Sequence, residues 1–184
     1  MKRFSRISAT AFGAMMLLLS AVIAVETVVR KLFSVSLGGV DEISGYAIAI
    51  GAPLAFTVAL VEQSHIRINL LHMKMPPQVQ AVLNLIAALL LAALAVFLLV
   101  FTFRTVGETR LYGSIAQTPW ATPLVWPQTV WLIAMSVFAA ASVWMAMRAL
   151  WLGVRGDWHG LNRGFAPDSV EDELRAELDD LERR

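Results

Sequence analysis

Charged side chains at the ends of long apolar runs are the residues of this sequence with the clearest chemistry. Glu26 and Arg30 close the first run, and the acidic pair Asp41-Glu42 opens the second. Ionisable groups at membrane depth are costly, so they are usually paired or functional. Glu26 precedes Arg30 by four positions, which places both on one helix face in the favourable acid-to-base order. We expect an ion pair there. It is either a snorkelling interfacial pair or a means of presenting Arg30 to a partner subunit.

The acidic pair Asp41-Glu42 follows two glycines that permit a tight turn. We expect Asp41 to cap the next helix, because a carboxylate accepts the free amide hydrogens of the first turn and suits the positive end of the helix dipole. Glu42 is not needed for that cap, so it serves either solvation at the surface or a subunit interface. Two carboxylates also suit acid–base or cation chemistry, but no third ligand and no Ser-His set accompanies them. We therefore predict no catalytic residue and no enzyme.

The segment between the second and third apolar runs is short and amphipathic. Ile66, Leu70 and Met73 follow an i, i+4, i+7 spacing, which predicts a helix lying in the plane of the membrane interface. Arg67 and Lys74 would reach the lipid headgroups from this helix. The segment would therefore widen the contact of the chain with lipid.

Two histidines of the same segment, His65 and His72, are seven positions apart and could share a helix face, which suggests haem or metal binding. Haem held by two histidines in a bundle usually draws both from facing transmembrane helices, and no apolar run of this sequence contains a histidine. Exposed or hydrogen-bonded histidines are the better interpretation. The chain also has no cysteine, which excludes thiolate sites. We expect neither a cofactor nor a metal ion in this chain.

Prolines punctuate the segment before the fourth apolar run. Pro119, Pro123 and Pro127 forbid a regular helix there and predict an extended connection, with Pro127 in the first turn of the next helix. Trp126 and Trp144, near the two ends of the fourth run, suit the interfacial aromatic belts. The connection is either a rigid link or a docking surface that faces the periplasm.

The elements that position these residues are four uncharged runs, at 7–25, 43–61, 78–103 and 128–147. About 20 apolar residues cross a bilayer core roughly 30 Å thick. The 184 residues are 58% hydrophobic and 16% charged, with a mean hydropathy of +0.65, which excludes an ordinary soluble domain. Scattered basic residues likewise exclude a nucleic-acid surface. We predict an all-α membrane protein with four transmembrane helices, at about 7–29, 42–62, 78–103 and 127–151.

The distribution of lysine and arginine predicts the orientation. Apart from the last seventeen residues, eight basic residues fall on the N-terminal side of the membrane and four on the other side, so the positive-inside rule places both termini in the cytoplasm. Residues 1–158 then form the transmembrane domain, and 159–184 form an acidic cytoplasmic tail. The first run could instead be a cleaved secretory signal, although its apolar stretch is longer than such signals usually have.

Taken in order, these motifs resemble the small membrane subunit of tripartite ATP-independent periplasmic (TRAP) transporters, the DctQ-like family. The resemblance covers most of residues 7–152. It rests on Arg30, on Asp41-Glu42 with Ser44 and Tyr46, on His65-Ile66-Arg67-Ile68 before Leu70-Leu71, and on Thr122-Pro123-Leu124 to Pro127-Gln128. The family commonly has an aromatic residue before the acidic pair and an aspartate after the His-Ile-Arg motif, where this chain has Val40 and Asn69. The second departure argues against an ion-binding role for that loop.

The resemblance implies a non-catalytic small permease subunit in the bacterial cytoplasmic (inner) membrane. Such a subunit scaffolds and anchors a large multi-span permease subunit. The large subunit takes up an organic acid, driven by sodium ions that bind to that partner, after an extracytoplasmic solute-binding protein delivers the acid. The expected subunit-interface or loop-organising residues of this chain are Arg30, Asp41, Glu42, His65 and Arg67.

Some features leave alternatives open. Small residues at Ala87, Ala88, Ala92, Ala93 and Ala95 mark a face for close approach, either to another helix of this chain or to the permease. For the whole chain, a membrane anchor or haem subunit of a redox enzyme complex is the alternative function. A small transporter that acts alone is a third class.

Overall fold

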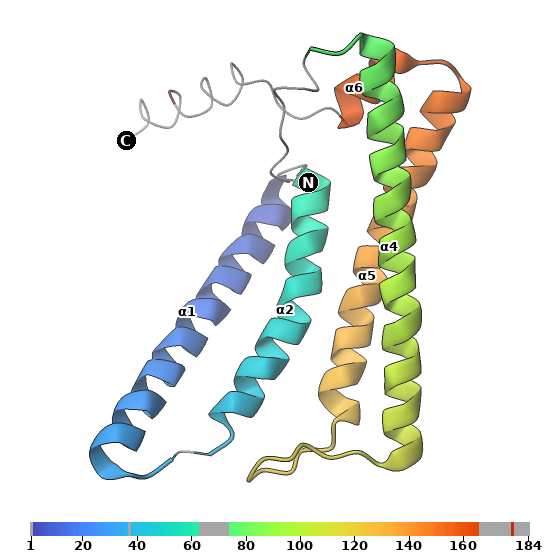
Figure 1. Ribbon diagram of the computed structural model, residues 1–184. Coiled ribbons are helices and arrows are strands. Elements are labelled where there is room, and N and C mark those ends of the chain that lie inside the picture. The colour runs from blue at the N-terminus through green and yellow to red at the C-terminus, as the bar shows by residue number, and fades with distance from the viewer. Residues whose placement is uncertain (1, 37, 63–73, 166–177, 179–184) are drawn as a thin grey trace.

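The computed structural model describes residues 2–36, 38–62, 74–165 and 178 (Figure 1). Five α-helices account for most of them: α1 (Lys2–Phe33), α2 (Val40–Glu62), α4 (Pro77–Tyr112), α5 (Val125–Val154) and α6 (Trp158–Phe165). Within these residues the only β-type pairing is a single bridge between Ile115 and Pro123. The predicted in-plane segment, with His65, Arg67 and His72, lies outside the described residues, as does most of the predicted acidic tail, at 166–177 and 179–184.

Four of the helices are long and apolar enough to cross a membrane, which confirms the predicted all-α fold with four candidate spans. The qualifying stretches are Phe12–Phe33, Val40–Val61, Pro77–Tyr112 and Val125–Val154. The helices extend past the apolar runs, because charged residues such as Arg104 and Arg110 continue a helix as readily as apolar ones. With 36 residues, α4 is about 54 Å long at 1.5 Å per residue. It ends at Gly113, which adopts the left-handed conformation and bonds back to the carbonyl of Thr109.

The four long helices form two hairpins that lie side by side. α1 packs on α2, α2 packs on α5, and α5 makes its most extensive contact with α4 (Figure 1). The turn from α1 to α2 and the connection from α4 to α5 lie at one end of the molecule. The other end holds the start of α1, the end of α2, the start of α4, the end of α5, and α6.

Small residues allow α4 and α5 to approach closely. Ala92 and Ala95 of α4 are buried, as are Ala139 and Ala146 of α5, and Met135 and Phe138 fill the space toward α2. The alanine face was expected to approach either another helix of this chain or the permease, and part of it packs within the chain. Its members Ala92 and Ala95 serve packing within the chain and Ala88 is half-buried, whereas Ala87 and Ala93 are exposed.

The sequence predicted an acidic tail at 159–184, and the short helix α6 at the start of that range was not foreseen. Leu161 is fully buried and Phe165 nearly so, and both pack against Ala81 of α4 and Ala149 of α5. These two side chains are four positions apart, so they share one face of a helix. The helical body of the protein therefore continues to Phe165.

Candidate functional site

The buried charges of the described residues gather at the end of the molecule where the two hairpins turn. We call this region the polar junction and define it by Glu26 and Arg30 of α1, the turn 34–39, Glu42 and Tyr46 of α2, and the connection 113–124 between α4 and α5. Glu26 is 4% exposed and Glu42 is 6% exposed. Buried carboxylates need specific partners, because burial without them costs several kcal/mol or more.

Glu26 finds its partners on its own helix and in the turn that follows. The Arg30 guanidinium donates two hydrogen bonds to Glu26 Oε1, from Nη2 at 2.7 Å and from Nε at 3.1 Å. Ser36 Oγ donates to the same oxygen at 2.7 Å. The ion pair expected from the i, i+4 spacing is therefore present, and the turn adds a partner that the spacing alone did not predict.

Ser36 carries this network into the backbone of the turn. Its Oγ accepts a hydrogen bond from the backbone N–H of Gly38 at 3.2 Å. Gly38 and Gly39 then adopt left-handed φ angles of +66° and +76°, which glycine tolerates without steric cost. The buried carboxylate of Glu26 thus fixes a turn that reverses the chain from α1 into α2.

Glu42 reaches across to the second hairpin. Tyr46, one turn further along α2, donates a hydrogen bond from its hydroxyl to Glu42 Oε1 at 2.8 Å. Thr118 Oγ1, from the connection between α4 and α5, donates to Glu42 Oε2. Asp41 beside it is exposed. Helix α2 begins at Val40, one residue before the predicted cap, so both acids lie in its first turn.

The connection 113–124 is held in shape by its own backbone. The N–H of Ala116 bonds to the carbonyl of Thr122 at 2.9 Å, and the N–H of Leu124 bonds to Ser114 at 3.1 Å. These bonds make a narrow loop whose tip contains Thr118 and Trp120. Pro127 lies in the first turn of α5, as predicted.

Trp120 brings the tip of this loop onto the α1–α2 turn. A Cβ on Gly39 would lie 2.4 Å from two atoms of the Trp120 indole, so only glycine leaves room for the ring. The loop therefore meets the first hairpin in two places. Thr118 bonds to Glu42 at the start of α2, and Trp120 packs on Gly39 in the turn before it.

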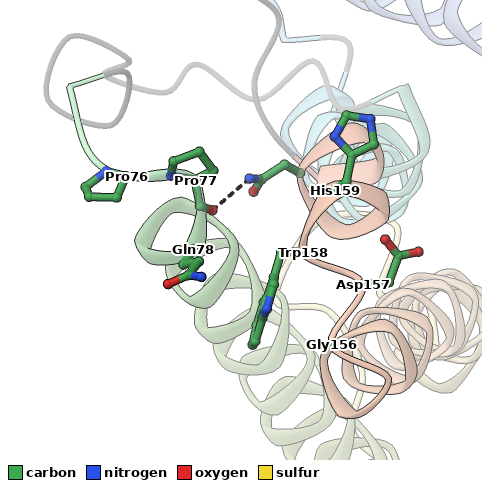
Figure 2. A pocket seen from close by; sticks show the side chains of 8 residues that line it. Pro76, Pro77, Gln78, Gly156, Asp157, Trp158 and His159 are labelled. Atoms are coloured by element: carbon green, nitrogen blue, oxygen red, sulfur yellow. Dashed lines mark hydrogen bonds between the residues drawn. The ribbon is translucent and has the colours of Figure 1, made fainter.

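The opposite end of the molecule holds a cavity of about 520 Å³ between the start of α4 and the start of α6 (Figure 2). Pro76, Pro77 and Gln78 line one side, and Gly156 to His159 with Asn162 line the other. Two hydrogen bonds join α6 to α4 beside it: Asn162 Nδ2 donates to the Pro77 carbonyl at 2.8 Å, and Asn84 Nδ2 donates to Asn162 Oδ1 at 3.2 Å. The described side chains that face it include no nucleophile with a base beside it.

The arrangement at the polar junction suits a mechanical role. Each buried carboxylate accepts hydrogen bonds from donors of the chain itself, and the described residues contain no group of three His, Asp or Glu side chains placed to hold a metal ion. Among the predicted site residues, Arg30, Asp41 and Glu42 lie at this end, while His65 and Arg67 are outside the described residues. Thr118 and Trp120 were missed, because the contacts that they make join positions about 80 residues apart.

Comparison with known protein families supports the same assignment for most of the chain. Residues 19–155 match the family model described as the DctQ component of tripartite ATP-independent periplasmic transporters. No individual curated protein matches the sequence. The matched range contains the second part of α1 and all of α2, α4 and α5, together with the whole polar junction. The chain therefore belongs to the DctQ family: it is a multi-pass inner-membrane protein and the small permease subunit of a TRAP transporter.

Proposed function

We propose that this subunit scaffolds and anchors the large permease subunit of its transporter, while the large subunit carries out the transport. In this proposal the large subunit couples sodium ions to the uptake of an organic acid, and a solute-binding protein delivers that acid. The proposal rests mainly on one observation, which is that the buried charges of this chain form contacts within the chain itself. Glu26 and Glu42 are both engaged in fastening the hairpins of this chain. Among the described residues, no further charged side chain is buried to line a path for a solute.

The shape of the subunit supports bracing rather than transport. The helices follow one another in the order α1, α2, α5, α4, so the chain presents broad apolar faces instead of enclosing a pore (Figure 1). On α1, the side chains of Leu17, Leu18, Leu32 and Phe33 are each about 70% exposed. Faces of this kind are stable only against lipid or against another membrane protein. The family match gives no support to a redox anchor or haem subunit.

A pull-down from native membranes tests the scaffold. The tagged chain is extracted in mild detergent, and mass spectrometry identifies and quantifies the proteins that come with it. We expect a large polytopic permease subunit in near-equal amount, and a tagged four-span protein of another family serves as the control. Recovery of the chain alone, from membranes shown to contain such a permease, would contradict the proposal. Transport by the purified chain alone would contradict it as well.

The residues that contact partners are part of the same proposal. Arg30 and Asp41 have exposed side chains at the polar junction, so they are placed to meet a partner, whereas buried Glu42 organises the loops. For His65 and Arg67 we propose the same interface role, on the basis of the sequence alone. We expect Asp41→Lys to weaken co-purification of the permease or of the solute-binding protein, and to lower the stability of this chain by no more than about 1 kcal/mol, the cost of a cation at the positive end of the α2 dipole. Unchanged co-purification of both would remove Asp41 from the interface.

A further inference from the structure

One outer face of α5 carries a stripe of exposed residues at helical spacing, which we call the α5 stripe. It begins at Trp126 and ends with Trp144, Arg148, Trp151 and Arg155. These last four recur at intervals of four, three and four residues, so at about 3.6 residues per turn they lie on one side of the helix. The residues Trp126, Trp144 and Trp151 are 72%, 68% and 53% exposed, and both arginines are exposed. No helix among the described residues covers this side of α5.

The tryptophans of the stripe locate the membrane boundaries. Trp126 and Trp144 are separated by roughly 27 Å along the helix at 1.5 Å per residue, close to the thickness of about 30 Å of a hydrocarbon core. Tryptophan prefers the two interfaces. If these two rings mark the interfaces, Arg148 lies roughly 6 Å beyond Trp144 along the helix, at the level of the lipid headgroups.

Arg148 and Arg155 flank Trp151 on the stripe, three residues before it and four residues after it. Arg155 folds back over Trp151, with its Cζ 3.7 Å from the centroid of the indole. Arg148 is three residues before Trp151, so it is a neighbour of the same tryptophan on this face of the helix. A guanidinium stacked on an aromatic ring keeps its N–H groups free at the edge for anionic oxygens. Among the described residues, no carboxylate lies within ion-pair distance of either arginine.

The rest of the stripe is suited to acyl chains rather than to a protein helix. Between its tryptophans the stripe carries Val130, Ile133, Val137 and Ala140, all exposed. Helices that pack on each other in membranes favour small residues. The inner face of α5 has these residues, including Ala134, Ser142 and Ala149, and it packs against α4. The outer face instead resembles a lipid-exposed helix that ends in cations at one headgroup level.

We propose that Arg148, Trp151 and Arg155 form a binding site for the phosphate headgroup of an anionic phospholipid, with the acyl chains lying along the aliphatic part of the α5 stripe. Two guanidinium groups favour a lipid with two phosphates, because each phosphate can accept the paired N–H groups of one arginine. Basic clusters with tryptophan at a membrane surface attract anionic headgroups by the same charge complementarity.

Native mass spectrometry of the delipidated full-length chain, titrated with tetraoleoyl cardiolipin or with dioleoyl phosphatidylethanolamine, tests this site. We expect the wild-type chain to prefer cardiolipin, and the double variant Arg148→Gln/Arg155→Gln to lose roughly tenfold or more of its cardiolipin affinity. The matched control Arg104→Gln/Arg163→Gln removes the same charge from exposed positions outside the stripe, and it should keep most of that affinity. Trp151→Leu, which removes the stacking platform, should lose an intermediate amount.

Three results would overturn the proposal. Equal affinities of the wild-type chain for the two lipids would show that no anionic site exists. An equal loss in the control variant would show attraction by net charge alone. If Arg148→Gln/Arg155→Gln no longer co-purified with the large permease but bound cardiolipin as before, the arginines would bind an acidic side chain of the permease instead. If the double variant fails to fold, as judged by its melting temperature, the two single variants are titrated instead, and each should lose part of the affinity.

Discussion

Glu26 and Glu42 are both buried acids near the polar junction, yet they act over different distances. Glu26 bonds to Arg30 four residues away and to Ser36 in the adjoining turn, so it stabilises the first hairpin. Glu42 bonds to Tyr46 on its own helix and to Thr118 in the other hairpin, so it joins the two. A substitution of Glu42 should therefore destabilise contacts of the second hairpin, whereas a substitution of Glu26 should destabilise only the first hairpin.

Glu42→Gln tests the bond between hairpins. The carboxylate accepts hydrogen bonds from the hydroxyls of Tyr46, Thr118 and Thr122, and an amide offers only one acceptor oxygen, so at least one hydroxyl must give up its bond or turn to accept from the amide NH2. We expect a loss of about 1 to 3 kcal/mol in stability and faster hydrogen exchange in residues 113–124. Asp41→Asn is the control at the neighbouring exposed acid and should change neither. If Glu42→Gln and Thr118→Val combine additively in a double-mutant cycle, the two side chains do not interact in the membrane.

Gly39→Ala tests the contact between the α1–α2 turn and Trp120. A left-handed conformation costs an alanine roughly 1 to 2 kcal/mol, and this cost applies equally to Gly38→Ala. Only at Gly39 would the new Cβ also collide with the indole, whereas at Gly38 it would lie 3.7 Å from Pro119. Gly39→Ala should therefore lower the melting temperature more than Gly38→Ala. In a Trp120→Ala background the two substitutions should cost the same, and a persistent difference would contradict the packing of Trp120 on Gly39.

At the scale of elements, α6 fastens the end of α5 to the start of α4. Leu161 is fully buried between the two helices, and Asn162 bonds to the Pro77 carbonyl. Because Pro77 begins α4, this bond sets the position of the chain where it returns from the segment after α2. Helix α6 therefore controls how the ends of two transmembrane helices sit relative to each other.

Leu161→Ala should release α6. Removing a fully buried leucine side chain costs about 2 to 5 kcal/mol, through lost transfer energy and the cavity that remains. We expect a lower melting temperature and loss of hydrogen-exchange protection in residues 158–165. Arg163→Ala, at an exposed position of the same helix, should stay within about 0.5 kcal/mol of the wild type. Protection that survives Leu161→Ala would mean that α6 is held mainly by Asn162.

The sequence predicted the elements better than their contacts. Long apolar runs and helix periodicity are local signals, so the four candidate spans and the Glu26–Arg30 pair could be foreseen. The helix ends were underestimated, since Arg104 and Arg110 extend α4 without breaking it. The bond between Glu42 and Thr118 could not be foreseen, because it depends on which hairpins are neighbours. Helix α6 was missed because eight residues give too short a pattern to separate from a polar tail.

At the scale of the whole molecule, the distribution of basic residues predicts how the chain is oriented in the membrane. The end with α6 carries the exposed cations Lys74, Arg148, Arg155 and Arg163, two of which the proposed lipid site uses, and the other end carries Arg30, Lys31, Arg104 and Arg110. The excess at the α6 end comes from Lys2, Arg3 and Arg6 at the start of α1. The polar junction is at the other end. From the positive-inside rule we expect the α6 end to face the cytoplasm and the junction to face the periplasm, where a solute-binding protein would arrive. The orientation therefore decides which partners each end can meet.

Cysteine accessibility measures this orientation directly, because the chain contains no cysteine that would react in the background. Gln117 in the connection 113–124 and His159 on α6 are both exposed, so Gln117→Cys and His159→Cys report on the two ends. In intact spheroplasts, a membrane-impermeant maleimide should label Gln117→Cys and leave His159→Cys unlabelled until the membrane is permeabilised. The opposite pattern would place the polar junction in the cytoplasm, and the exposed Asp41 could then not contact a periplasmic protein. Because each variant is the control for the other, unequal expression cannot produce both halves of the expected result.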